Sequence, residues 1–352
     1  MSEFVVEKSQ LLKGLIESEL KPHVKKVDCE AFYAEGFLKK LGEAGLFSST
    51  NKSQKEYILD EMYLVEETAK TCMTTAFCLW CHLAGLTYVR NTSNLALKNK
   101  FLPLLESGEL LAATGLSNPM KYYAGLESLH LRAKRVEGGY VVSGVLPAVS
   151  NLGAGHWFGI IANVSDSQRF TGFVSCDADG LRMKEKSEFL GANGSATYSC
   201  QFDNVFIPDE SVLAEDADVF VETIRPAFVL YQIPLGLGVT EESIASVEKV
   251  VPRQNGCNVF LGKQASDLDS SVGEIREKVE RLFAGEQFEW KEIAKVRLAT
   301  AYLTLEAVQT SMLHTGSSGY LRDCGPSRRL REAYFYANLT PTVKHLEKVL
   351  VS

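Results

Sequence analysis

The sequence predicts a multidomain protein of α and β structure. Its parts are an N-terminal helical domain (1–110), a central antiparallel β-barrel (111–215) and a C-terminal four-helix bundle (216–352). The first observation behind this prediction is periodicity, because apolar residues recur at helical spacing in the outer parts and alternate with polar residues in the middle part. The second is composition: 352 residues with 45% hydrophobic and 23% charged side chains are typical of a globular protein with several domains.

Helical spacing in the first part appears in three segments. Residues 30–47 carry apolar side chains every three to four positions, and we expect this helix to end at Gly45, because glycine commonly ends helices. Residues 58–89 form a longer helical pattern that small polar residues interrupt twice, and residues 94–110 form a shorter one. We therefore expect only helices up to about residue 110.

Strands are indicated in the middle part by period-two alternation and by turn residues. Leu129, Leu131 and Ala133 alternate with polar neighbours, and Glu137-Gly138-Gly139 predicts a tight turn into the next strand. Glycine, aspartate and asparagine residues separate the other predicted strands, which cover residues 140–146, 156–164, 169–175 and 197–207. About 100 residues of such strands are typical of an antiparallel sheet or barrel.

Helical spacing returns in the last part. Residues 224–251 are apolar on every face in their first half, so we expect them in the middle of a helix bundle. Further helices are predicted over residues 270–283, 288–313 and 327–339. Because one bundle of this size would not bury all of the apolar surface of residues 224–251, we expect a homodimer or homotetramer formed through these bundles.

One short motif points to a different function. Residues 78–82, C-L-W-C-H, match the pattern of c-type haem attachment. Such attachment follows export, whereas the first 22 residues mix Glu and Lys and lead us to expect no signal segment. On a helix, the two cysteines share a face of small residues with Thr74 and Gly85, which favours close packing of a neighbouring helix over haem or metal binding.

Net charge and cysteine usage limit the classes of binding partner and the cellular compartment that we expect. The net charge of −7 disfavours nucleic acid and anionic membrane as partners, and no stretch reaches the ~20 apolar residues of a membrane-spanning helix. The eight cysteines are scattered, which is typical of a reducing compartment, so we expect a cytoplasmic protein. We expect no metal site, because the single close cysteine pair has no second ligand pair nearby.

Five motifs in chain order resemble those of the acyl-CoA dehydrogenase superfamily. They are the segment 100–119, K-F-L-P-L-L-E-S-G-E-L-L followed by A-A-T-G-L-S-N-P; the strand pair at 138–164; the segment 190–213 with Phe-Asp-x-Val-x-Ile-Pro; Arg225-Pro226; and the segment 316–333, which opens with G-S-S-G-Y. The resemblance covers almost the whole chain, and its specificity lies in the order and separation of the motifs. It implies FAD, an oxidoreductase acting on a small molecule or acyl thioester, and usually a homotetramer.

The resemblance also assigns cofactor-binding positions. Thr114 falls on the threonine that hydrogen-bonds the flavin pyrimidine, with backbone contacts from Leu111 and Ala113. Ser150 falls on the threonine whose hydroxyl meets flavin N5, and Ala148 stands where the family usually has a tryptophan near the ring. The further cofactor positions that the resemblance implies are Gly316, Gly319 and Thr342.

The chain departs from the family pattern at both ends of its site. The Arg-x-x-Phe-Gly motif, which a neighbouring subunit contributes at the adenine end, is reduced to N-V-F-L-G at 258–262, without its arginine. Thr340 stands where most of these dehydrogenases have their catalytic glutamate, and a hydroxyl cannot serve as that base. The alternative base position is Ile224; Glu222 lies about 200° around the helix from it, and with Arg225 we expect it on the substrate side.

Three interpretations remain open. The first is a flavoenzyme that needs no carboxylate base, such as a flavin-dependent monooxygenase of the same fold. The second is a dehydrogenase-type enzyme acting on CH–CH donors with an unusual base or a carrier-bound substrate. The third is a non-catalytic subunit that forms a hetero-oligomer with a complete homologue.

Overall fold

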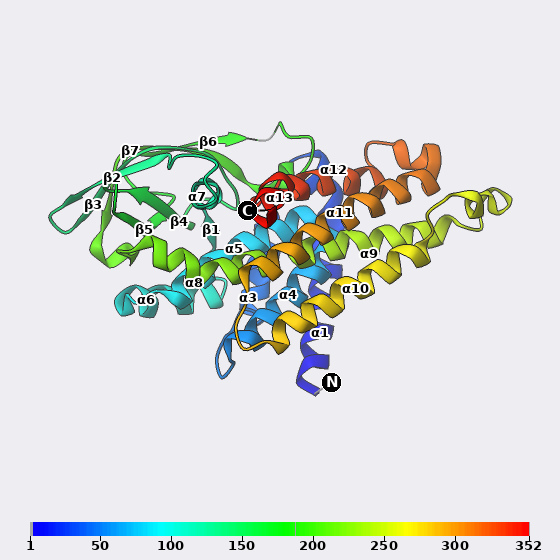
Figure 1. The fold of residues 1–352 in the computed structure, drawn as a ribbon, viewed down its shortest axis with the longest axis horizontal. Coiled ribbons are helices and arrows are strands. Elements are labelled where there is room, and N and C mark those ends of the chain that lie inside the picture. The colour runs from blue at the N-terminus through cyan, green and yellow to red at the C-terminus, as the bar shows by residue number, and fades with distance from the viewer. Residues whose placement is uncertain (1–2, 187, 352) are drawn as a thin grey trace.

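The computed structural model describes residues 3–186 and 188–351. The central sheet lies at one end of an elongated molecule, and the hairpin of α9 (Ile233–Val250) and α10 (Ala265–Ala284) projects at the other end (Figure 1). Helices of the first and last parts of the chain lie between these ends. The predicted order of a helical domain, a central sheet and a helix bundle is therefore confirmed.

The first part of the chain is helical, as predicted. Its helices are α1 (Glu3–Leu15), α2 (Val24–Cys29), α3 (Glu35–Glu43), α4 (Gln54–Thr71), α5 (Met73–Asn91) and α6 (Leu95–Glu106). Gly45, with φ of +70°, follows the end of α3 in the left-handed conformation that glycine adopts without strain. Ser53 begins α4 with a reciprocal capping box, and Cys72 separates α4 from α5 in an extended conformation.

The middle part forms one eight-stranded sheet. Its strands are β1 (Ala112–Thr114), β2 (Leu131–Val136), β3 (Gly139–Val149), β4 (Trp157–Asn163), β5 (Arg169–Ser175), β6 (Leu181–Lys186), β7 (Thr197–Pro208) and β8 (Val212–Ala214). The hydrogen-bonded order is β6-β7-β3-β2-β4-β5-β8, with β1 beside β4. The sheet curls around one core, in which the rings of Tyr140 on β3 and Phe170 on β5 stack 4.0 Å apart.

The sheet is mostly antiparallel, but two of its described pairings are parallel. β1 runs parallel to β4, and one residue pair, Arg132 and Asn163, joins β2 to β4 in parallel. Parallel strands need a long connection, and the 42 residues between Thr114 and Trp157 supply one through the β2–β3 hairpin. Period-two alternation does not distinguish these arrangements, so the expected antiparallel barrel is corrected to a curled, mixed sheet.

The last part is a helix bundle with two more helices than predicted around its core. Its helices are α8 (Ala217–Leu230), α9, α10, α11 (Trp290–Thr315), α12 (Gly325–Asn338) and α13 (Val343–Val351). The long apolar pattern at 224–251 is two helices, because the chain turns at Tyr231-Gln232. A short helix, α7 (Ser117–Tyr123), precedes β2, and short 3₁₀ segments include η3 (Asn193–Ser195), η5 (Gln254–Phe260) and η6 (Gly316–Tyr320).

The apolar helix α9 is covered by the chain itself. Every residue from Ala227 to Thr240 is buried, and α9 packs against α4 of the first part as well as α11 and α12 of the bundle. The first and last parts therefore share one hydrophobic core. This corrects the argument that the apolar surface of residues 224–251 requires a second subunit.

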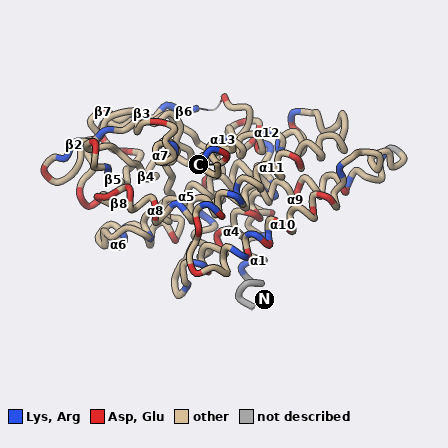
Figure 2. The backbone as a smooth tube through the Cα atoms, in the orientation of Figure 1, with Lys and Arg blue, Asp and Glu red and all other residues tan. Residues whose placement is uncertain are grey.

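Charged residues are distributed over the whole molecule. Lysine and arginine are interspersed with aspartate and glutamate along the chain (Figure 2). Of the helices that the structure describes, none is both long enough and apolar enough to cross a membrane.

Candidate functional site

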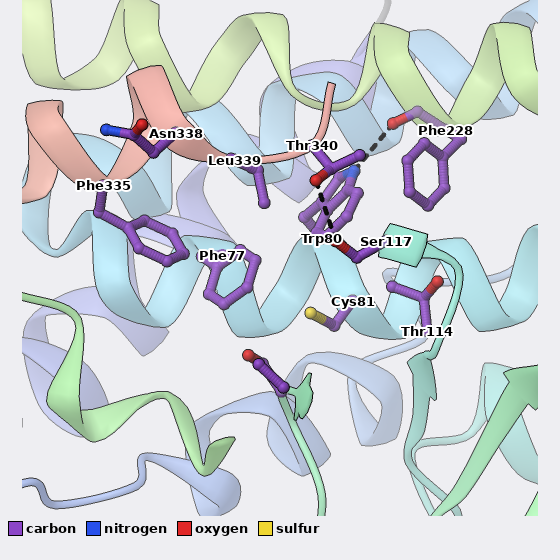
Figure 3. A pocket seen from close by; sticks show the side chains of 12 residues that line it. Phe77, Trp80, Cys81, Thr114, Ser117, Phe228, Phe335, Asn338, Leu339 and Thr340 are labelled. Carbon is purple, nitrogen blue, oxygen red and sulfur yellow. Dashed lines mark hydrogen bonds between the residues drawn. The ribbon is translucent and has the colours of Figure 1, made fainter. Parts of the chain in front are cut away.

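A cavity of about 180 Å³ lies where the sheet meets the two helical parts (Figure 3). The segments that meet there are α5, the turn between β1 and α7, the end of β3, α8 and the turn after α12. The lining residues are Phe77, Trp80, Cys81, Thr114, Ser117, Ala148, Ser150, Phe228, Phe335, Asn338, Leu339 and Thr340. Four positions singled out from the sequence, Thr114, Ala148, Ser150 and Thr340, are thus brought together from three distant segments.

Thr114 presents its hydroxyl to this cavity at the end of β1. Its Oγ1 accepts a hydrogen bond from the Leu116 backbone N–H at 3.2 Å and lies 2.6 Å from the Tyr88 hydroxyl. Burial raises the pKa of Tyr88, so its phenol stays protonated and can donate to Thr114. The threonine proton is then available to an acceptor in the cavity.

Ser150 follows the last residue of β3 and faces the cavity beside Ala148. Its Oγ lies 2.6 Å from Thr197 Oγ1, which lies 2.8 Å from Ser195 Oγ. Thr197 and Ser195 are buried, so this line of hydroxyls leads from the cavity into the protein.

Thr340 closes the cavity from the turn between α12 and α13. Its Oγ1 lies 2.9 Å from Ser117 Oγ (Figure 3), and its carbonyl accepts a hydrogen bond from Gln232 Nε2 at 2.9 Å. Among the described residues that line the cavity there is no Asp, Glu or His. Cys81 is the titratable lining group, and burial raises its pKa well above the usual value for a thiol.

A buried arginine supports the Thr340 turn from behind. Arg297 on α11 donates from Nε to Gln232 Oε1 at 2.9 Å and from Nη2 to the Tyr336 carbonyl at 2.8 Å. Its guanidinium also stacks 3.7 Å from the centre of the Tyr336 ring. Arg297 is fully buried, and Gln232 connects it directly to the Thr340 carbonyl.

The predicted substrate residues lie apart from the cavity. Arg225 stacks on Trp290, 4.5 Å from the ring centre, and lines a separate space of about 80 Å³ with Pro341 and His345. Glu222 is exposed, and Ile224, the alternative base position, is fully buried. The structure therefore places no carboxylate from α8 in the cavity, as far as the described residues go.

The remaining predicted cofactor positions also lie outside the cavity lining. Leu111 and Ala113 are fully buried before and within β1. Gly316 and Gly319 lie in η6, at the opposite end of α12 from Thr340. Thr342 begins α13, where its Oγ1 accepts a hydrogen bond from the His345 backbone N–H.

Several lining residues were missed from the sequence. Ser117 had a local signal, because it belongs to the segment 100–119 that carries the first of the five resembling motifs. Phe77 and Trp80 lie on α5, and Phe335 on α12. Nothing in their local sequence distinguishes them from the buried aromatic residues of other helices.

The C-L-W-C-H motif is part of buried helix α5. Cys78 and Cys81 are buried thiols, as expected. His82 Nδ1 accepts a hydrogen bond from the Ala112 backbone N–H at 3.1 Å, so Nε2–H donates to the Leu105 carbonyl at 3.2 Å. The small residue Gly85 packs directly against Ala112. At Gly85 the close neighbour is therefore strand β1, whereas Thr74 on the same face donates to Glu332 on helix α12.

The cavity fits a flat ring system with hydrogen-bonding atoms on its edge. Its walls are aromatic and aliphatic side chains, and its polar groups are neutral hydroxyls and the Asn338 amide. Thr114 supplies a hydroxyl that can donate when Tyr88 donates to it, whereas a charged ligand head group would find no opposite charge among these lining residues. These features suit the isoalloxazine ring of a flavin.

Comparisons with known proteins agree with this arrangement. Residues 9–109 match the family model "Acyl-CoA dehydrogenase, N-terminal domain". The mitochondrial isovaleryl-CoA dehydrogenase of Solanum tuberosum is 25% identical over 347 residues, which cover 91% of this chain and 83% of the relative.

Two solved structures illustrate the similarity of fold. A glutaryl-CoA dehydrogenase in complex with glutaryl-CoA has a TM-score of 0.89 and 18% identity, covering 100% of this chain and 95% of that one. A glutaryl-CoA dehydrogenase from Mycobacterium smegmatis in complex with FADH2 has a TM-score of 0.83 and 16% identity, covering 99% and 94%. Residues 9–109 therefore match the N-terminal domain of the acyl-CoA dehydrogenase family, and the whole chain has the fold of these enzymes.

Proposed function

We propose that this protein is an FAD-dependent oxidoreductase that does not carry out standard α,β-dehydrogenation of acyl-CoA. The observation behind the proposal is the Thr340–Ser117 hydroxyl pair in a cavity whose described lining residues include no carboxylate or imidazole. Removal of an α-proton from a thioester needs a base with a suitable pKa close to the carbon. Neither a threonine nor a serine hydroxyl provides one without an activating partner.

The flavin ring is held in this proposal by the cavity residues. Thr114 donates a hydrogen bond, Ser150 meets the ring edge, and Phe77, Trp80 and Phe335 supply apolar contacts. When bound, the flavin supplies hydride or electron transfer. The protein residues orient the ring, exclude water and leave room beside Ala148, where the family usually has a tryptophan.

An oligomer is part of the proposal, for a reason other than the apolar helix α9. Apolar side chains are exposed at the end of the bundle farthest from the sheet, which we call the distal patch: Val259, Phe260, Leu313, Tyr320 and Leu321. The segment after α9 and the end of α11 are joined there, because Asn258 Nδ2 donates a hydrogen bond to the His314 carbonyl at 3.1 Å. An exposed patch of this kind marks a protein interface, and we propose a homodimer or homotetramer through it.

The absence of a base among the described lining residues also supports a second candidate. The chain would be a non-catalytic subunit that pairs with a complete homologue. The two candidates differ in one property, because the second does not require a bound flavin.

The absorption spectrum of the purified protein tests the first candidate. We expect the paired near-ultraviolet and blue bands of an oxidised flavin after incubation with FAD. T114V, which removes a hydroxyl from the cavity, should weaken FAD binding by about 5- to 10-fold. The matched control is T171V, because Thr171 is also buried, in β5, its hydroxyl has no partner among the described atoms, and it does not line the cavity. A protein that binds no FAD would contradict the proposal and favour the second candidate.

A further inference from the structure

We propose that Ser150 meets its ligand as a hydrogen-bond acceptor. The reason is that the hydroxyls of Ser150, Thr197 and Ser195 form a relay in which each hydroxyl donates its proton to the next one, away from the cavity. The inference rests on the proposed function, since it takes the ligand beside Ser150 to be the flavin. It adds to that function two residues, Thr197 and Ser195, which do not line the cavity, and a preference for one redox state of the cofactor.

The polarity of the relay follows from its inner end. Ser195 Oγ donates to the Ala192 carbonyl at 2.7 Å, and a carbonyl can only accept. With its proton used there, Ser195 accepts from Thr197, whose Oγ1 is 2.8 Å away. Thr197 in turn accepts from Ser150, at 2.6 Å. The Ser150 proton therefore points into the protein, and its free lone pair faces the cavity.

Backbone contacts hold the relay in place. The Asn151 N–H donates to the Ser195 carbonyl at 2.9 Å, and the Leu152 N–H donates to the Ala196 carbonyl at 3.1 Å. Val149 pairs with Tyr198 across β3 and β7 on the other side of Ser150. Because the segments carrying the hydroxyls are joined on both sides of the relay, the oxygen atoms are fixed and only the protons can be rearranged.

The opposite polarity is less favourable in this structure. It would turn the Ser195 proton toward Thr197 and the Ser150 proton into the cavity. The Ala192 carbonyl would keep only the Ser195 backbone N–H, at 3.3 Å, in place of the hydroxyl at 2.7 Å. A ligand that accepts a hydrogen bond from Ser150 therefore has to break a bond of the relay, either the Ser150–Thr197 bond or, if all three hydroxyls turn, the bond to the Ala192 carbonyl. A ligand that donates to Ser150 breaks neither.

This difference separates the two redox states of a flavin. N5 of the oxidised ring has a lone pair and accepts a hydrogen bond, whereas N5 of the reduced ring carries a hydrogen and can donate one. The relay thus favours reduced over oxidised flavin at Ser150. Ser195 and Thr197 act through Ser150 and are positioning residues.

The test compares the dissociation constants of oxidised and reduced FAD, the latter under anaerobic conditions, for three proteins. S195A removes the inner acceptor, so Thr197 donates to Ser150 and the Ser150 proton turns to the cavity. We expect S195A to shift the ratio of the two dissociation constants about tenfold toward oxidised FAD, which corresponds to about 30 mV in a two-electron potential. T197V disconnects Ser150 from the relay, and we expect an intermediate ratio.

A double-mutant cycle shows whether the effect passes through Ser150. In the S150A background, adding S195A should leave the ratio unchanged, since no hydroxyl remains to be oriented. The proposed relay would be contradicted if S195A shifted the ratio of the two dissociation constants equally in the wild-type and S150A backgrounds. It would also be contradicted if S195A left the wild-type ratio unchanged. Failure of every protein to bind FAD in either state would contradict the proposed function, and a second measurement then decides on the relay itself.

That second measurement is neutron diffraction from deuterium-exchanged crystals of the protein without FAD. We expect the Ser195 deuteron on the line to the Ala192 carbonyl and the Thr197 deuteron on the line to Ser195. A Thr197 deuteron directed at Ser150 would overturn the inference without reference to any cofactor.

Discussion

The hydroxyl oxygens of Ser117 and Thr340 lie 2.9 Å apart, although the two residues are 223 positions apart in the chain. Ser117 belongs to the segment that leaves the sheet at β1, and Thr340 belongs to the turn between the last two helices. Their contact closes one side of the cavity in which we propose that a flavin binds. The predictions below start from this contact and from the contacts that support it.

Substitution T340E should introduce the base that the cavity lacks. If an acyl-CoA is bound, we expect the rate of its dehydrogenation to exceed that of T340Q by about 10²- to 10⁴-fold, because glutamine has the same shape but cannot accept the proton. The assay uses a range of acyl chain lengths with an artificial electron acceptor. Wild type should resemble T340Q. Rapid turnover by wild type would show that a base exists elsewhere.

Substitution Q232L should destabilise the Thr340 turn. It leaves Arg297 Nε without an acceptor and the Thr340 carbonyl without a donor, both in buried surroundings. We expect the free energy of unfolding to fall by about 2–4 kcal/mol. Q309L is the matched control, because Gln309 is exposed on α11 and its loss should change stability by less than about 0.5 kcal/mol. Equal effects of both substitutions in urea unfolding would contradict this account of Gln232.

Neutral His82 should make stability depend on pH. Burial lowers the pKa of His82 to about 3, below the ~6.5 of an unfolded chain. The part of the free energy of unfolding that depends on neutral His82 is therefore complete above pH 6.5 and is lost as the pH falls from 6.5 toward 3. At pH 5 the loss is about 2 kcal/mol. H82F removes this group, so the stability advantage of wild type over H82F should narrow by that amount between pH 7.5 and pH 5. A constant difference across this range would show that His82 does not remain neutral in the folded state.

Close packing at Gly85 should not tolerate a methyl group. A Cβ at this position would lie 2.3 Å from the Ala112 Cβ on β1. We expect G85A to lower the free energy of unfolding by about 1–3 kcal/mol. G273A is the control, because a Cβ at Gly273 in α10 meets nothing within 4 Å. Since alanine favours the helix over glycine, G273A should stabilise by about 0.5–1 kcal/mol. Thermal unfolding of both variants would separate steric conflict from helix propensity.

The distal patch should hold subunits together. Phe260 is 88% exposed at the bundle tip, and F260D would place a charge in the proposed interface. We expect light scattering at micromolar concentration to give a dimer or tetramer for wild type and a smaller species for F260D. L95D is the control, because Leu95 is also exposed but begins α6, near the sheet. A monomeric wild type would contradict the proposed assembly.

The order of the three parts of the fold could be predicted from the sequence, because periodicity depends only on which residues face a core. Apolar spacing at 224–251 predicted a buried helix, and α9 is buried. It could not predict what covers that helix, since the hydrophobic effect has no direction. A second subunit was expected, but α4 of the same chain packs there.

The sequence by itself determined which residue types stand at the positions of the candidate site. Thr340, Ser150 and Thr114 could be found because their motifs keep their order and separation along the chain. Only the tertiary structure decided what these residues contact. Ser117 meets Thr340, and Thr197 fixes the Ser150 proton, because packing brings segments far apart in sequence within 3 Å. A hydrogen bond depends on that distance and direction, and neither property is encoded in a local pattern.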